Sequence, residues 1–304
     1  MSTRATAIPA DSQTMSRSWA YLLLTKPDVT FLVVMTTAAG FFLGVRGPLD
    51  VVAGYLSMFN AVLGTSLVAA GTAALNHFLE RASDAKMRRT CSRPLPLGVL
   101  HSSEALAFGA ALIAAGGIYL ALFSNWLACG LALLTTVLYL GLYTPLKKRT
   151  TWATAIGAFP GAIPPLVGWA SARGSLNEGA WILFGILFLW QFPHFYSIAW
   201  MYREDYGRAG IQMLPVIDRS GSATFGQIIF CAAALVPVSL LPSVIGLAGD
   251  TYFFGAVLIG MLLLQACLWA ARSRTNVRAK WLMHATVAHI PALLGLLMLD
   301  KVVK

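Results

Sequence analysis

The stretch VAGYLSMFNAVLGTSLVAAGTAALNHFLERASDAKMRRTCSRP, residues 52–94, decides the fold class of this chain. Its first part, from Val52 to Asn76, contains no charged side chain and is longer than the roughly 20 residues that an apolar helix needs to cross a bilayer. A polar run rich in charged side chains follows directly, over residues 77–93. The stretch therefore predicts a membrane-spanning helix that ends in a charged segment.

Apolar stretches of the same kind recur along nearly the whole chain. Of its 304 residues, 58% are hydrophobic and only 11% are charged, whereas a soluble domain is about 25% charged. A soluble core of this size cannot hide so much apolar surface, so the sequence predicts an all-α polytopic membrane protein with about nine transmembrane helices. The expected spans are Val29–Val45, Val52–Asn76, Ala105–Ser124, Trp126–Tyr143, Thr154–Ala172, Ala180–Met201, Phe225–Leu247, Thr251–Ala271 and Trp281–Leu299.

The net charge of +10 is a topology signal rather than a sign of nucleic-acid binding. If the N-terminus lies inside, the outer side holds only Arg46, Arg173, Lys301 and Lys304, and the other 18 of the 22 Lys and Arg (22 − 4) lie inside. Cytoplasmic loops carry such an excess of positive charge. We therefore expect an N-in, C-out protein of the bacterial inner (plasma) membrane. Its partner is then the lipid bilayer, and its long polar loops face the cytoplasm.

The remaining bulk features bound the domain organisation. The N-terminal residues lack the apolar core of a signal peptide, so residues 1–25 are expected to form a disordered cytoplasmic tail and residues 26–304 a single domain. The four cysteines show no C-x-x-C spacing, so neither zinc nor a disulfide framework is indicated. Gly and Pro interrupt the fifth span, which predicts a kink that serves either packing or a cavity.

Asn76, Glu80 and Asp84 follow one another at a spacing of four residues. On a helix, residues spaced in this way lie along one face. Two carboxylates and an amide suit a divalent cation that carries a phosphorylated substrate, because Mg²⁺ takes one or two carboxylates and keeps its other positions for water and phosphate oxygens. These three residues, here called the ladder, are the candidate Mg²⁺ ligands.

The arginines that follow the ladder fit the same hypothesis. Arg88 and Arg93 would bind the oxygens of a diphosphate bidentately. The alternative is a solvated helix end with local Glu80–Arg81 and Asp84–Arg88 pairs, which needs no ligand. Ionisable groups beside an apolar span are usually functional, and this favours the site.

A second acidic segment, Tyr202-Arg-Glu-Asp-Tyr-Gly-Arg208, follows the sixth span. Alone, Glu204 and Asp205 are typical of an ordinary loop. Together with the ladder, Asp205 and Arg208 would form the opposing wall of a metal and arginine clamp on a diphosphate. This hypothesis requires the ends of the second and sixth spans to meet.

The sixth span also carries the block Trp190-Gln191-Phe-Pro-His194, with Tyr202 at its end. One buried histidine is more often structural than a ligand, and contact with a substrate is an equal alternative for His194. Lys147 lies in a Lys-Lys-Arg run and is either a topology anchor or a phosphate ligand. Both alternatives depend on how close these residues lie to the ladder.

These motifs resemble the UbiA superfamily of intramembrane prenyltransferases. The resemblance covers most of residues 26–220, and spans seven to nine match only as hydrophobic helices. The Gly-Ile-x-Met-Leu-Pro pattern at residues 210–215 is typical of the branch that prenylates haem. The matching blocks are Asn76–Asp84, Met87–Thr90 with Arg93-Pro-Leu, Tyr143–Thr150, Gly157–Trp169, Trp190–Phe195 and Asp205–Val216.

The resemblance implies a bundle of nine helices around a central cavity. It also implies Mg²⁺-dependent transfer of a farnesyl group from farnesyl diphosphate to protoheme IX (haem B), with addition of water, to give haem O and diphosphate. The ladder would hold Mg²⁺, Asp205 would form the second acidic motif, and haem A synthase or terminal oxidase assembly is an implied partner. The implied diphosphate-binding residues are Arg88, Arg93, Lys147 and Arg208, and the implied haem-cavity residues are Trp190, Gln191, His194 and Tyr202.

The sequence departs from the family pattern at two places. Glu80 occupies a ladder position that usually holds Asp, which moves the carboxylate by one methylene. The second motif lacks a full D-x-x-x-D, which puts a second metal at Asp205 in doubt, although the haem branch shares this feature. The rival functions are a UbiA-type prenyltransferase of quinone precursors and a non-enzymatic haem transporter or chaperone. A transporter favours isolated charges at mid-membrane, whereas these carboxylates cluster at one face.

Overall fold

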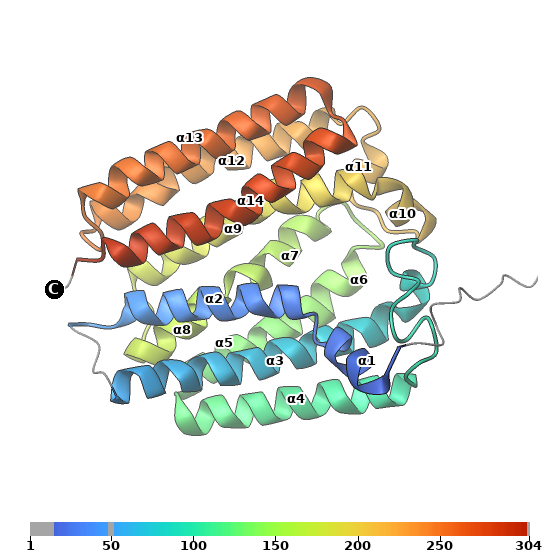
Figure 1. Cartoon of the computed structure of the whole chain (residues 1–304), viewed down its shortest axis with the longest axis horizontal. Helices are drawn as coiled ribbons and strands as arrows, with labels where there is room; N and C mark the ends of the chain where they lie inside the picture. Colours follow the sequence, from blue (N-terminus) through green and yellow to red (C-terminus); the bar gives the residue numbers. More distant parts are fainter. Residues whose placement is uncertain (1–14, 48–51, 303–304) are drawn as a thin grey trace, which may run out of the picture.

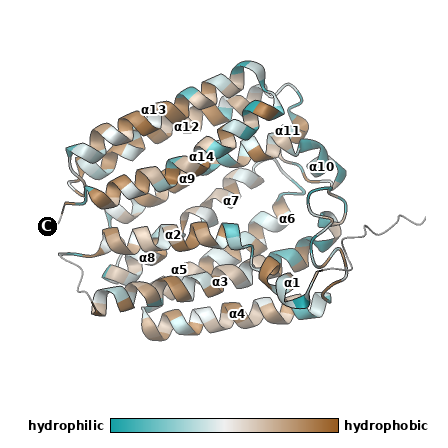
Figure 2. Ribbon diagram, viewed as in Figure 1, coloured by the Kyte–Doolittle hydropathy of each residue, from teal (hydrophilic) through white to brown (hydrophobic). Residues whose placement is uncertain are grey.

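The computed structural model describes residues 15–47 and 52–302, and this part of the chain contains eight helices that are long and apolar enough to cross a membrane. They run side by side along one direction (Figure 1) and are apolar over most of their length (Figure 2). The eight are α2 (Pro27–Gly44), α3 (Ala53–Asp84), α4 (Ser102–Phe123), α5 (Trp126–Val137) continued by the π-helix η2 (Leu138–Tyr143) and by α6 (Thr144–Leu146), α9 (Glu178–Met201), α12 (Ser222–Val244), α13 (Asp250–Ser273) and α14 (Asn276–Leu299).

The expected fifth span is broken into two short helices, α7 (Ala153–Ala162) and α8 (Pro164–Arg173). Pro164 and Pro165 lack the backbone N–H groups that would continue the hydrogen-bond ladder of α7, and so a new helix begins there. The kink predicted from the Gly and Pro residues is therefore confirmed. The two pieces together cover the expected residues, which accounts for eight continuous spans where about nine were expected.

α2 and α8 approach so closely that only glycine fits at the contact. A Cβ built on Gly168 would lie 1.9 Å from the carbonyl oxygen of Thr37, and one built on Gly40 would lie 2.1 Å from that of Pro165. Because both obstacles are backbone atoms, neither can rotate away. This contact ties the broken span to α2, the helix that begins directly after Lys26.

We expect Gly168→Ala to lower the stability of the protein by about 1–3 kcal/mol or more, because the added methyl group must push α2 and α8 apart. The measurement is the midpoint of thermal unfolding in detergent. Gly226→Ala in α12 is the matched control, since a Cβ there would meet nothing within 4 Å. Equal unfolding midpoints for the two variants would show that α2 and α8 can move apart without loss of stability.

Part of the N-terminal segment that was expected to be a disordered tail is helical. Residues 17–24 form α1 (Arg17–Leu24), whose N-cap Ser16 accepts a hydrogen bond from the backbone of Trp19. Ala20 and Leu24 are fully buried and pack against α3, α4 and the preceding loop. Their burial orders the segment, so the prediction for 1–25 is wrong over these residues; residues 1–14 lie outside the described part of the chain.

The largest core cluster lies around α9, with α12, α13 and α14 on one side and parts of α2, α7 and α8 on the other. Figure 1 shows α9 and α12–α14 as one group of helices and α1–α5 with α8 as a second, with α7 between them. α9 presents a buried face that includes Leu183, Ile186, Leu187 and Trp190. This helix therefore fixes the position of the second acidic segment, which begins where α9 ends.

Candidate functional site

α3 continues past the apolar span and carries all three ladder residues. The helix ends at Asp84, so Asn76, Glu80 and Asp84 lie on one helix at the predicted four-residue spacing. All three are buried, with exposed fractions of 1%, 6% and 0%. Carboxylates are almost never buried to this extent unless they are paired, so the contacts of each residue decide what this face of α3 can do.

Each ladder residue contacts one cationic side chain from a different segment of the chain. These cations come from the start of α2, from the loop that follows α3 and from the residue after α6. The contacts are Lys26 Nζ donating to Asn76 Oδ1 at 2.5 Å, an ion pair between Lys147 and Glu80, and Arg93 Nη1 donating to Asp84 Oδ2 at 2.8 Å. Three cations and two carboxylates thus share one buried region and leave it positively charged.

The predicted alternative of a solvated helix end is wrong. Arg81 donates to the carbonyl of Phe78 and lies over its ring, and it makes no ion pair with Glu80. Arg88 is exposed, and the structure shows no ion pair between it and Asp84. The carboxylates are instead buried and paired with distant cations, as expected of a site rather than of a solvated helix end.

Lys26 is a site residue that the sequence reasoning treated only as a topology charge. It adopts a left-handed backbone conformation with φ of 47°, which is uncommon for a residue other than Gly, Asn or Asp. This turn joins α1 to α2 and directs the side chain at Asn76. Burial lowers the pKa of the Lys26 ammonium to about 8. Its place before Pro27, at the same end of the bundle as the ladder, is the one sequence signal that could have indicated it.

The π-helix η2 and the short helix α6 position Lys147. The hydroxyl of Thr144 donates to the carbonyl of Tyr139 and accepts from the amide of Asn76, at 2.9 and 3.3 Å. The Lys147 ammonium then lies 5.6 Å from the centre of the Tyr143 ring and pairs with Glu80. π-helical turns are frequent at functional sites because they redirect the side chains that follow.

The second acidic segment reaches the same end of the bundle. Asp205, on α10 (Arg203–Arg208), is 7% exposed and forms an ion pair with Arg208. Its other carboxylate oxygen accepts from the backbone N–H of Arg89 at 3.2 Å, and the N–H of Gln212 donates to the carbonyl of Lys147 at 2.8 Å. The ends of the second and sixth spans therefore meet, as the clamp hypothesis requires. Glu204 is exposed and makes no hydrogen bond or ion pair with the described residues of this cluster.

Arg89, rather than Arg88, joins the two acidic segments. Its guanidinium lies 5.0 Å from the ring centre of Tyr202 and donates to the Tyr206 hydroxyl at 3.4 Å. Tyr202 lies at the exposed end of α9 beneath this arginine, and its expected place in a haem cavity stays a prediction. A role for Arg88 in binding diphosphate stays a prediction.

The residues Trp190, Gln191 and His194 hold α9 against its neighbours. Trp190 Nε1 donates to the carbonyl of Thr286 at 2.8 Å, and His194 Nδ1 lies 2.9 Å from the Thr286 hydroxyl. The amide of Gln191 donates to the carbonyl of Ala158 in α7 at 3.0 Å. His194 lies eight residues, or about 12 Å, along the helix from Tyr202. Contact of this set with a substrate stays a prediction.

The ladder fits Mg²⁺ better than a metal that needs a complete protein cage. Among the described residues, no group of three or more His, Cys, Asp and Glu could hold a metal ion. Mg²⁺ needs fewer protein ligands, because it keeps waters and takes substrate phosphate oxygens. Asp84 Oδ1 is buried without a hydrogen-bond partner and is free to ligate. Asn76 Oδ1 accepts from Lys26, and that contact would compete with metal binding.

Comparison with known proteins agrees with this arrangement. A model of the UbiA prenyltransferase family matches residues 33–290. A protoheme IX farnesyltransferase of Solibacter usitatus is 48% identical over 286 residues, which cover 92% of this chain and 98% of that protein. A protoheme IX farnesyltransferase of Koribacter versatilis is 44% identical and covers 93% of each chain.

Solved structures of the same fold lie further away in sequence. A digeranylgeranylglyceryl phosphate synthase superposes with a TM-score of 0.76 at 19% identity, over 94% of this chain and 99% of that one. A UbiA homologue from Archaeoglobus fulgidus bound to GPP and Mg²⁺ superposes with a TM-score of 0.62 at 14% identity, over 91% and 99%. The fold, the family match and the near-full-length relatives agree, and this chain belongs to the UbiA prenyltransferase family.

Proposed function

We propose that this membrane protein transfers the farnesyl group of farnesyl diphosphate to protoheme IX and, with addition of water, forms haem O and diphosphate. The observation that carries the choice of acceptor is the 48% identity, over nearly the full length, to a protoheme IX farnesyltransferase. The observation that supports diphosphate chemistry is the buried cluster of carboxylates and cations at the end of α3.

In this proposal, Glu80 and Asp84 hold a Mg²⁺ ion, which neutralises negative charge on the diphosphate when it is bound. The cations that now contact the ladder, Lys26, Arg93 and Lys147, turn to phosphate oxygens, for which charge-assisted hydrogen bonds are strong. They are held by long-range contacts before the substrate arrives. Stabilisation of the leaving group thus requires little rearrangement at the moment of reaction.

The transfer itself breaks the bond between C1 of the farnesyl chain and the diphosphate oxygen, and the leaving diphosphate keeps the electron pair. The π electrons of a haem vinyl group form the new bond to C1. Water adds to the resulting cationic carbon and releases one proton, which leaves a hydroxyl group. The residues of this chain hold the leaving group and exclude water until the carbon–carbon bond has formed.

A row of aromatic rings on α9 supports an apolar path for the prenyl chain. Phe184, Phe188 and Phe192 follow one another at four-residue spacing, with ring centres 5.9 and 5.3 Å apart. Phe159 of α7 joins the row 5.0 Å from Phe188. Aromatic faces also stabilise a positively charged carbon, so this row suits an allylic chain on grounds beyond its hydrophobicity.

The proposed location is the bacterial inner membrane, with the N-terminus and the ladder on the cytoplasmic side. This orientation follows from the 18 of 22 Lys and Arg that the alternation of spans assigns to that side. Diphosphate substrates are soluble at their charged end, so a cytoplasmic site meets them directly.

Purified protein tests the proposed function when it is supplied with protoheme IX, farnesyl diphosphate and Mg²⁺, and the pigments are separated and weighed by mass spectrometry. We expect haem O to form, to disappear when EDTA removes Mg²⁺ and to return when excess Mg²⁺ is added. Prenylation of a quinone precursor without any haem product would contradict this function and show that the protein is an aromatic prenyltransferase. Absence of transfer to either acceptor, together with haem binding, would favour a haem carrier.

We expect Lys26→Met to raise the KM for farnesyl diphosphate by about tenfold, because a charge-assisted contact to phosphate is lost. Methionine and lysine have a similar conformational energy at a backbone φ of 47°, so we expect the turn before α2 to keep its conformation. Lys86→Met, at an exposed lysine in the loop after α3, is the matched control. An unchanged KM in Lys26→Met would show that Lys26 contacts Asn76 but does not bind the diphosphate.

A further inference from the structure

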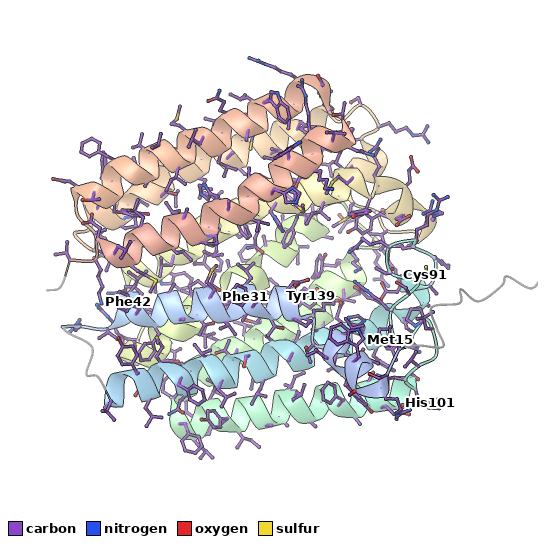
Figure 3. The ribbon with its side chains drawn as sticks, in the orientation of Figure 1. Met15, Phe31, Phe42, Cys91, His101 and Tyr139 are labelled. Atoms are coloured by element: carbon purple, nitrogen blue, oxygen red, sulfur yellow. The ribbon has the colours of Figure 1, made fainter. Side chains whose placement is uncertain are left out.

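A charged pocket, of about 120 Å³, lies at the end of the bundle opposite to the ladder. α2 begins beside the ladder and ends at this pocket, and its 18 residues rise about 27 Å. Figure 3 shows the two ends, with Cys91 in the loop after α3 at one and Phe42 of α2 at the other. The separation is close to the roughly 30 Å thickness of the hydrocarbon core, so the pocket lies at the opposite membrane surface.

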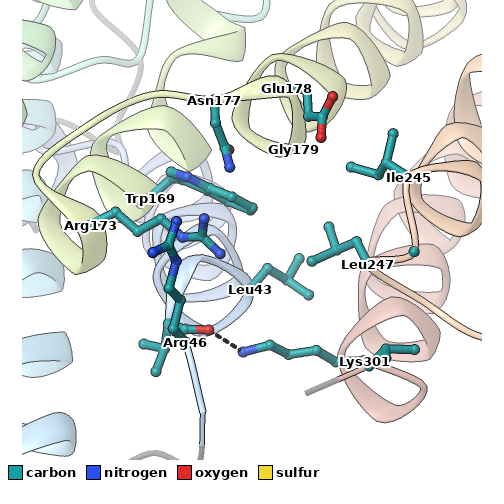
Figure 4. A pocket seen from close by; sticks show the side chains of 13 residues that line it. Leu43, Arg46, Trp169, Arg173, Asn177, Glu178, Gly179, Ile245, Leu247 and Lys301 are labelled. Atoms are coloured by element: carbon teal, nitrogen blue, oxygen red, sulfur yellow. Dashed lines mark hydrogen bonds between the residues drawn. The ribbon is translucent and has the colours of Figure 1, made fainter. Parts of the chain in front are cut away.

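Three cationic side chains converge on this pocket. Arg46, Arg173 and Lys301 line it together with apolar side chains, and Glu178, which is exposed, is the one acidic lining residue in the part of the chain that the structure describes. Figure 4 shows the guanidinium groups of Arg46 and Arg173 next to each other and Lys301 extending from the facing wall. None of the four ion pairs within the described chain involves these cations.

Helix capping accounts for two of the three cations but not for the third. Lys301 Nζ donates to the carbonyls of Phe42 and Val45, at 2.7 and 2.9 Å, and Arg173 Nε donates to that of Gly44. Cations are stabilised by the carbonyls at a helix C-terminus, here that of α2. Arg46, which is exposed, has no hydrogen bond or ion pair with any described residue, and its guanidinium lies beside that of Arg173.

The distribution of charge over the chain makes this convergence informative. The alternation of spans leaves only Arg46, Arg173, Lys301 and Lys304 on this side of the membrane. Lys304 lies outside the described residues, and the other three all enter one pocket. On a side with so few cations, their meeting gives the pocket a positive potential, which a bound anion would offset.

We propose that this pocket binds a phosphate group carried by an acidic membrane lipid. The planar guanidinium fork matches phosphate oxygens in geometry and charge. Lipid phosphates lie at the depth at which the pocket opens, and Leu43, Ile245 and Leu247 offer apolar contact to the attached chains. Arg46, which has no hydrogen-bond or ion-pair partner among the described residues, is the cation that the phosphate engages first. The site is separate from prenyl transfer and does not depend on the proposed function.

Native mass spectrometry of the delipidated full-length protein tests this site by counting bound lipid. We expect phosphatidylglycerol to bind about tenfold more tightly than zwitterionic phosphatidylcholine, and Arg46→Gln to remove most of that preference. Arg272→Gln is the matched control, because Arg272 is an exposed arginine near the end of α13, far along the chain from the pocket. A thermal unfolding midpoint for each variant checks that the fold is intact.

Three outcomes decide the proposal. Equal binding of the two lipids, or an equal loss in Arg46→Gln and Arg272→Gln, would overturn it. A preference that depends on Arg46 and is competed by millimolar inorganic phosphate supports it, because the recognised group is then the phosphate. Arg46-dependent binding of inorganic phosphate, without any preference for phosphatidylglycerol, would overturn the proposal. The site would then bind free phosphate and not a lipid.

Discussion

Replacement of Asp84 by Asn is expected to lower kcat/KM for farnesyl diphosphate by about 10²–10³-fold, while the fold stays in place. Asp84 is fully buried, with one carboxylate oxygen paired to Arg93 and the other without a hydrogen-bond partner. Asparagine fills the same volume but supplies no negative charge, so it weakens metal binding without opening a cavity. The side chain of Arg93 is 22% exposed and reaches solvent, which limits the cost of losing its anionic partner.

Two further measurements separate loss of metal binding from loss of structure. The Mg²⁺ concentration that gives half-maximal activity should rise in Asp84→Asn, whereas the thermal unfolding midpoint in detergent should change little. Glu204→Gln is the matched control, because Glu204 is an exposed acid of the second acidic segment. Near-normal turnover of Asp84→Asn would show that the ladder does not bind the metal ion.

The fold was predictable because the bilayer imposes a simple rule on the sequence. Apolar runs such as Val52–Asn76 must form helices, since no water is present to satisfy an open backbone, and α3 begins within a residue of the expected start. The break at Pro164 was predictable because proline interrupts the backbone hydrogen bonds that such a helix needs. α1 was missed because it is short and buries only Ala20 and Leu24, which gives no run of apolar residues long enough to detect.

The site was only partly predictable, because local spacing does not specify distant partners. The four-residue period placed Asn76, Glu80 and Asp84 on one face of α3, but it could not show that Lys26 would face Asn76. That contact depends on a left-handed turn at Lys26. Similarly, the helical period ends at Asp84, so the spacing could not indicate that Arg89, and not Arg88, contacts the second acidic segment.

The pair of Glu80 and Lys147 provides the second large effect. Both side chains are almost completely buried, with exposed fractions of 8% and 10%. When one member of such a pair is removed, the other remains as an uncompensated charge, which typically costs about 3–5 kcal/mol. We therefore expect Lys147→Met to lower the unfolding midpoint strongly and to abolish transfer. Lys148→Met, at the exposed neighbour, should change neither property greatly.

Loss of activity in Lys147→Met alone does not distinguish an unstable protein from a missing phosphate ligand. The double variant Glu80→Gln/Lys147→Met makes this distinction, because it removes both charges of the pair together. Neutral replacements of both members of a buried ion pair are often tolerated. The double variant should therefore recover most of the lost thermal stability.

Activity should not recover with stability, because the double variant lacks both a proposed metal ligand and a proposed phosphate contact. The expected result is a folded protein whose transfer rate stays at least about 10²-fold below that of the parent chain. The single variant Glu80→Gln completes the cycle and measures the coupling between the two positions. Recovery of stability and transfer together would contradict the proposed roles, since the pair would then serve only to hold α3 against α6.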